Sequence, residues 1–165
     1  MRHSSDSGFT LTEKLIVIAV LNILCAIAVP GWIGFINSQE VNVANDRIYW
    51  CFQKAKSEAR REKLVMECLI RQTPSGIEYS VNRVDEAPQW KNAGIDPKVT
   101  IKTSTFYFDK KDGAYRMQYN WLGVSNGRLG RIHVTKGNAE RCTVVSTLLG
   151  AMRTGQRGNA STPCR

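Results

Sequence analysis

The chain has 165 residues, a length that suits one globular domain together with an N-terminal anchor. Lys and Arg outnumber Asp and Glu by 23 to 14, and the resulting net charge of +9 favours anionic partners such as nucleic acid or lipid headgroups. The sequence contains no CxxC metal spacing, P-loop or nucleophile elbow, so it predicts no enzyme, no metal site and no cofactor.

The first element is an apolar segment at residues 9–29, preceded by a short polar leader at residues 1–8. As an α-helix with a rise of roughly 1.5 Å per residue, it is long enough to cross a bilayer core of about 30 Å. A carboxylate, Glu13, lies near the start of this run. The residues alone leave two interpretations open: a signal anchor with an incidental glutamate, or a removable leader in front of a retained helix.

The stretch G-F-T-L-T-E at residues 8–13, followed by the apolar run and Pro30, resembles the N-terminus of type IV prepilins and type II secretion pseudopilins. This resemblance implies that a prepilin peptidase cleaves between Gly8 and Phe9 and that Phe9 is then N-methylated. Glu13 would become the fifth residue of the mature chain, which is the usual glutamate position in that family. Lys14 departs from the apolar residue that the family usually has there.

Glu13 needs a physical reason, because a carboxylate in the hydrocarbon region costs about 2.5–3.5 kcal/mol or more. The free amine of Phe9 after cleavage is the nearest new cation, in the same chain or in an adjacent subunit. A pair between subunits would bring an incoming subunit into register. We therefore expect Glu13 to serve assembly.

The next segment, 30–63, is predicted to continue the helix into a globular head. Its apolar residues recur in steps of three and four, which is typical of a helix with one buried face. The remaining residues, 64–165, alternate like strands and are predicted to form a β-rich head. The expected strands are 64–70, 77–81, 99–108, 114–119, 130–135 and 141–147, with a loop at 83–98 and a hairpin turn at Asp112-Gly113.

The predicted fold class is therefore α+β, with a long N-terminal helix packed on an antiparallel β-sheet head. The head is similar to the GspH/FimT group of minor pilins and pseudopilins in three stretches: 54–64, 119–127 and 141–153. That group often ends its closing strand in Gly-Arg-x-Arg. Here the stretch is Gly150-Ala151-Met152-Arg153, so only the second arginine is kept.

Cys25 lies in the apolar segment and is interpreted as a small apolar residue. The other cysteines allow three pairings, which sequence does not decide. We favour Cys142 with Cys164, which would order the polar tail, and Cys51 with Cys68, which would join helix to sheet. Free buried thiols are the alternative. His133 would be the only histidine of the mature chain, and a structural role is expected for it.

Two functional hypotheses follow. The resemblance implies a minor pilin of the inner membrane that incorporates into or primes a pilus, its head on the extracytoplasmic side; the alternative is a pseudopilin of a type II secretion system. Its partners would be other pilin subunits, the prepilin peptidase and membrane lipid. The second hypothesis adds binding of double-stranded DNA, as in FimT-like members. The candidate cations are Arg141, Arg153, Arg157 and Arg165; the alternative is a solvated basic surface.

Overall fold

The computed structural model describes residues 10–126, 129–156 and 164, without the side chains of residues 29 and 30. It divides between Ile36 and Asn37 into two compact units. The first unit contributes the beginning of the helix α1, which spans Leu11–Glu62. The second contains the rest of α1 and the strands. The leader and the processing site, Gly8 and Phe9, lie outside the described residues.

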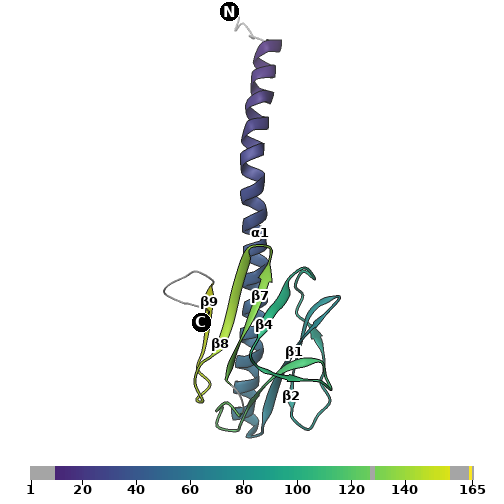
Figure 1. Ribbon diagram of the computed structural model, residues 1–165, viewed down its shortest axis with the longest axis vertical. Helices are drawn as coiled ribbons and strands as arrows, with labels where there is room; N and C mark the ends of the chain where they lie inside the picture. The colour runs from purple at the N-terminus through teal and green to yellow at the C-terminus, as the bar shows by residue number, and fades with distance from the viewer. Residues whose placement is uncertain (1–9, 127–128, 157–163, 165) are drawn as a thin grey trace, which may run out of the picture. The chain divides into compact units, whose positions relative to one another are not determined.

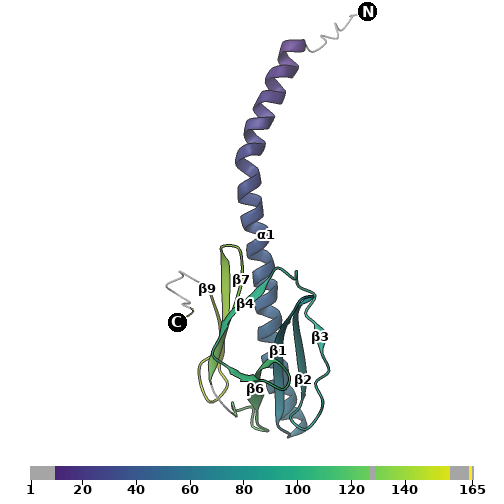
Figure 2. The same cartoon turned by 45° about the vertical axis from the view of Figure 1, so that its right-hand side comes forward.

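Residues 37–165 form the head, in which α1 packs against two antiparallel sheets. The first sheet has the strand order β3-β2-β1-β6-β5 and the second the order β4-β7-β8-β9. Figure 2 separates them, with β7 and β9 on one side of α1 and β2 and β3 on the other. The strands are β1 Met66–Thr73, β2 Gly76–Arg83, β3 Lys91–Asn92, β4 Thr100–Ser104, β5 Tyr107–Asp109, β6 Ala114–Tyr119, β7 Gly130–Lys136, β8 Ala139–Val145 and β9 Met152–Gln156.

The core lies where the predicted helix stripe meets both sheets. Val41, Ala44 and Ile48 are at most 1% exposed. Further along α1, the ring of Phe52 packs against Phe106 at 5.2 Å between centroids. The predicted α+β class, a long helix packed on antiparallel strands, is thereby confirmed.

The helix ends for a local reason. Lys63 has a φ of 57°, in the left-handed region, and the amide of Leu64 donates to the carbonyl of Ala59 over 3.3 Å. This bond reaches back across the last turn and satisfies a carbonyl that the helix itself leaves unpaired. The chain then enters β1, the central strand of the first sheet.

Three predictions of strands were wrong. The single strand expected at 99–108 is two strands, β4 and β5, which belong to different sheets. The expected loop at 83–98 contains the short strand β3, and the C-terminal tail contributes β9. In Figure 1, β9 lies beside β8 at the edge of the second sheet. The expected hairpin is present, because β5 and β6 pair across a turn in which Gly113 has a φ of 60°.

Candidate functional site

The first turn of α1 places Glu13 at the start of the apolar helix. The hydroxyl of Thr10 accepts a hydrogen bond from the amide of Glu13 over 3.3 Å, so Thr10 caps the helix. Thr10 and Glu13 have the spacing of a capping box, in which the carboxylate also suits the positive end of the helix dipole. Because Phe9 lies outside the described residues, its pairing with Glu13 stays a prediction.

After this turn, the part of α1 that belongs to the first unit is largely apolar on all sides. Its large side chains are exposed around the whole circumference; Leu15, Ile18 and Ile23, for example, are 61%, 56% and 63% exposed. By its length and composition, α1 is long and apolar enough to cross a membrane. The amide of Asn22 bonds back to the carbonyl of Ile18 over 2.8 Å. The apolar helix therefore fits membrane anchoring.

Two disulfides organise the head. Cys51 of α1 bonds to Cys68 of β1, with their Cα atoms 6.0 Å apart. Cys142 of β8 bonds to Cys164 near the C-terminus, with a Cα separation of 5.9 Å. These are the pairings favoured above, while Cys25 is an exposed free thiol of the helix. The first bond joins helix to sheet, and the second holds Cys164 on β8.

The candidate DNA-binding arginines do not share one surface. Thr143 of β8 bonds to Asn45 of α1 over 2.9 Å, which shows that it faces the helix. Arg141, two residues earlier, lies on that same face. Arg153 pairs with Val144 and therefore lies on the opposite, outer face. Arg157 and Arg165 lie outside the described residues.

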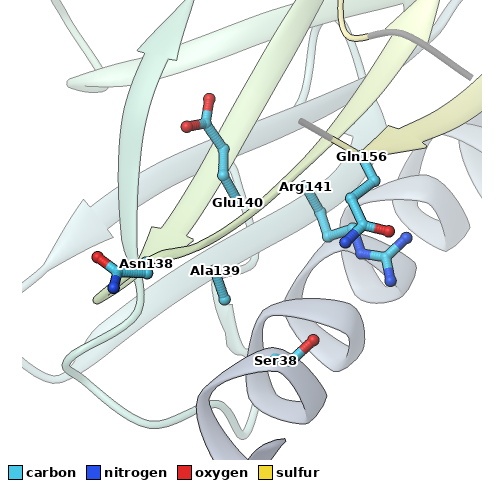
Figure 3. Close-up of a pocket in the computed structure, with 6 residues that line it drawn as sticks. All are labelled: Ser38, Asn138, Ala139, Glu140, Arg141 and Gln156. Carbon is cyan, nitrogen blue, oxygen red and sulfur yellow. The ribbon is translucent and has the colours of Figure 1, made fainter. Parts of the chain in front are cut away.

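Figure 3 shows the position of Arg141. Its side chain and that of Gln156 point the same way beside α1, whereas Glu140 points in the opposite direction. Arg141 lines a small cleft of about 110 Å³ with Ser38 of α1. This cleft is polar and recessed, so Arg141 is poorly placed to share an extended ligand with Arg153.

The outer face of the second sheet carries a different pair of cations. Arg131 of β7 is opposite Val144 of β8, and Val144 is opposite Arg153 of β9. The two arginines therefore stand in one row, with Cα atoms about 10 Å apart for two strand spacings. A guanidinium N–H of Arg131 donates to the carbonyl of Cys164 over 3.2 Å. The alternation of Arg131, Ile132, His133 and Val134 was the signal that could have placed Arg131 on this face.

Glu140 on the same face is neutralised by its neighbours. Its carboxylate accepts a hydrogen bond from Lys102 over 2.8 Å and contacts Nδ1 of His133 at 3.0 Å. The Lys102 ammonium, assisted by His133 and opposed by burial, lowers the pKa of Glu140 below its usual 4.5. His133 is buried in this group, as expected for a structural residue. In the described part of the chain no cluster of His, Cys, Asp and Glu could hold a metal.

A buried carboxylate elsewhere also has structural partners. Glu67 of β1 is 2% exposed, and its oxygens contact Asn82 at 2.9 Å, Arg116 at 3.2 Å and Gln118 at 3.2 Å. These contacts join β1 to its neighbours β2 and β6 and satisfy the buried carboxylate. We therefore assign Glu67 to the fold and not to chemistry.

Comparison with known proteins covers both units. Residues 3–29 match the family model of the prokaryotic N-terminal methylation motif. No curated protein matches the chain. Among solved structures it is similar to the type IV minor pilin FimU of Pseudomonas aeruginosa, with a TM-score of 0.56 and 13% identity over 79% of this chain and 99% of FimU. Because the chain combines the N-terminal methylation motif with a pilin fold, it is a type IV pilin-like protein.

Proposed function

We propose that the chain is a minor type IV pilin of the GspH/FimT group that incorporates into or primes a pilus. The observation that carries this proposal is Glu13 in the first turn of a helix whose apolar side chains are exposed on all sides. In a membrane or a filament, those side chains would be covered by lipid or by the helices of other subunits. Glu13 is then the single acidic group available there to an incoming N-terminal amine.

The proposal includes a defined order of processing and membrane anchoring. A prepilin peptidase removes residues 1–8, Phe9 is N-methylated, and the helix holds the subunit in the inner membrane with its head outside the cytoplasm. The two disulfides support this orientation, because such bonds persist in oxidising compartments. Intact-mass analysis of the protein from its own membrane should show the loss of residues 1–8 and one added methyl group. A mature chain that begins at Met1 contradicts the proposal.

The role of Glu13 is tested by incorporation. Glu13→Gln removes the charge without changing side-chain size, and Lys14→Gln is the matched control that removes the neighbouring charge. We expect Glu13→Gln to be processed normally but to be depleted from sheared filaments by about tenfold, corresponding to an ion pair of about 1.4 kcal/mol. Lys14→Gln should incorporate like the parent. Equal incorporation of both variants argues against an assembly role for Glu13.

The pseudopilin alternative uses the same helix chemistry and differs in the assembly it serves. Deletion of the gene in the native host separates the two. Loss of surface pili with normal protein secretion supports the pilus role. Accumulation of secreted enzymes in the periplasm, with normal pili, supports the secretion role instead.

Binding of double-stranded DNA is the second candidate function. It is favoured by the row formed by Arg131 and Arg153 on a sheet face where the carboxylate of Glu140 is already paired. Arginines that contact phosphates without base contacts give weak binding that is indifferent to sequence and falls steeply with salt.

A titration with duplex DNA at several salt concentrations tests this function. Each arginine lost should reduce the salt slope by about one. The double variant Arg131→Gln/Arg153→Gln should therefore lose about two units of slope, while Arg141→Gln, on the opposite face, serves as the control. If the double variant binds like the parent, the outer face is not a DNA surface.

A further inference from the structure

Two neighbouring loops of the head expose four large apolar side chains. Trp121 and Leu122 follow β6 and are 56% and 51% exposed, and Leu148 and Leu149 lie between β8 and β9 and are 62% and 73% exposed. We call these four residues the apolar patch. The amide of Ser125 donates to the carbonyl of Leu148 over 2.7 Å, so the two loops are directly joined. In Figure 1 the loop between β8 and β9 lies at the end of the head where α1 finishes.

Two side chains of α1 bind the backbone of the loops that carry the patch. The ammonium of Lys56 donates to the carbonyls of Leu149 and Gly150 over 3.1 and 2.7 Å. One turn later, Nε of Arg60 donates to the carbonyl of Leu122 over 3.0 Å. These bonds satisfy the polar backbone of both loops on the helix side. The apolar side chains of the same loops remain in solvent, which is unfavourable unless a partner covers them.

The loop that carries Trp121 and Leu122 also lines a cavity. Asn126 of this loop contributes to a cavity of about 350 Å³, which has a mixed lining: Leu64, Val65, Arg83, Val84, Asp85, Gln118 and Asn126.

We propose that the apolar patch docks onto the head of a different pilin-like subunit, whose own surface there is apolar with an acidic rim. This inference rests on the proposed function, because it places the partner in the same assembly. The charge of the chain favours a different subunit. Its net charge is +9, and Lys56 and Arg60 of α1 contact the two loops of the patch, so a second copy would meet like charges.

The size of the patch also points to a partner within an assembly. Four side chains provide a patch of a few hundred Å², whereas a stable free complex buries about 1,200–2,000 Å² in total. Subunits that already share a helix bundle have a high effective concentration for one another. For them a small patch is sufficient to fix which head lies next to which.

The test is cross-linking of the full-length chain in its native cells. A photoreactive phenylalanine replaces Leu149, and the matched control places it at Tyr107, which is 57% exposed on β5. Adducts are identified by mass spectrometry, and the same cells are sheared to measure the chain in filaments. We expect position 149, and not position 107, to yield an adduct with a different subunit that has an N-terminal methylation motif and an acidic head.

The outcomes separate the two levels of the proposal. A chain that is present in filaments but gives no adduct at position 149, or an adduct only with lipid or with a second copy, overturns the patch assignment alone. A chain that is absent from filaments overturns both the patch assignment and the proposed function. An equal adduct from position 107 shows that the contact is not specific to the patch and also overturns it.

A pair of variants measures the contribution of the patch. Leu148→Ser/Leu149→Ser changes only exposed side chains, so the head should remain folded. Incorporation into filaments should fall by about tenfold, as for the loss of an interface contact of about 1.4 kcal/mol. Tyr107→Ser, on the other sheet, should incorporate normally. If the two variants incorporate equally, the patch carries no docking contact.

Discussion

The two parts of α1 show how one helix serves two different surroundings. Before Ile36 the large apolar side chains are exposed on every side, as with Leu15 at 61% and Ile23 at 63%. After Asn37 they form a stripe, and Val41 and Ile48 are 0% and 1% exposed. The backbone geometry is the same throughout. The distribution of apolar residues around the helix is therefore what distinguishes a segment that needs an external apolar partner from one that completes a domain core.

The largest expected effect comes from removing the first part. A chain that begins at Asn37 keeps the whole buried stripe and both disulfides. It should be soluble without detergent and show mixed helix and strand signals by circular dichroism, whereas the full chain should need detergent or a membrane. An insoluble or purely helical product would mean that the head depends on the apolar segment, and the contrast between the two parts would fail.

A matched pair of substitutions sharpens the contrast. Ile48→Ala removes a side chain that is 1% exposed, and such a change typically lowers the free energy of unfolding by about 2–5 kcal/mol. Ile18→Ala removes one that is 56% exposed, so the stability of the head should not change. Denaturant unfolding in detergent, followed by tryptophan fluorescence, measures both. Equal destabilisation would show that the two parts share one core.

Loss of a disulfide should lower the free energy of unfolding of the head by a similar or slightly smaller amount than Ile48→Ala. They close loops with sequence separations of 17 and 22 residues. In the chain-entropy model each should contribute about 3 kcal/mol to the free energy of unfolding. Replacing Cys51 and Cys68 with Ala should therefore lower the unfolding midpoint. Cys25→Ala is the control, and it should leave the midpoint unchanged.

The smallest effect concerns Lys102 and Glu140. Because the folded-state pKa of Glu140 is lowered from 4.5, its contribution to stability is present above pH 4.5 and is lost as the pH falls through the lowered value. Lys102→Met should destabilise the head by at most about 1 kcal/mol at neutral pH, since the side chain of Lys102 is 48% exposed and solvent weakens the pair. In urea unfolding, the difference from the parent should shrink as the pH falls below 4.5. A difference that stays constant with pH would exclude this ion pair as its source; Lys111→Met is the control.

Much of the fold was predictable, because both the apolar segment and the helix stripe are strong local patterns. The stretch 99–108 was misread because it is strand-like throughout, while Phe106 turns the chain from one sheet to the other to pack on Phe52. β9 was missed because Arg153, Thr154 and Gly155 show no apolar alternation. That strand exists through its pairing with β8, which is a tertiary effect.

The candidate site was predictable only where it depends on local spacing. The position of Glu13 relative to Thr10 follows from the sequence alone. The separation of Arg141 from Arg153 does not, because it depends on how β9 registers against β8, and a shift of one residue would reverse the face of every side chain. That Arg131 and Arg153 lie in one row depends on two registers, that of β7 against β8 and that of β8 against β9.

The bond between Cys51 and Cys68 also decides how the head bears a mechanical load. In the filament proposed above, tension applied to α1 would reach β1, the central strand of the first sheet, through this covalent link. From there it spreads sideways into the ladders with β2 and β6, so many hydrogen bonds share the force. The part of α1 that follows Cys51 would be shielded from this tension. Under oxidising conditions, the resistance of the head to pulling would therefore depend on the hydrogen bonds of the first sheet and not only on the packing of α1.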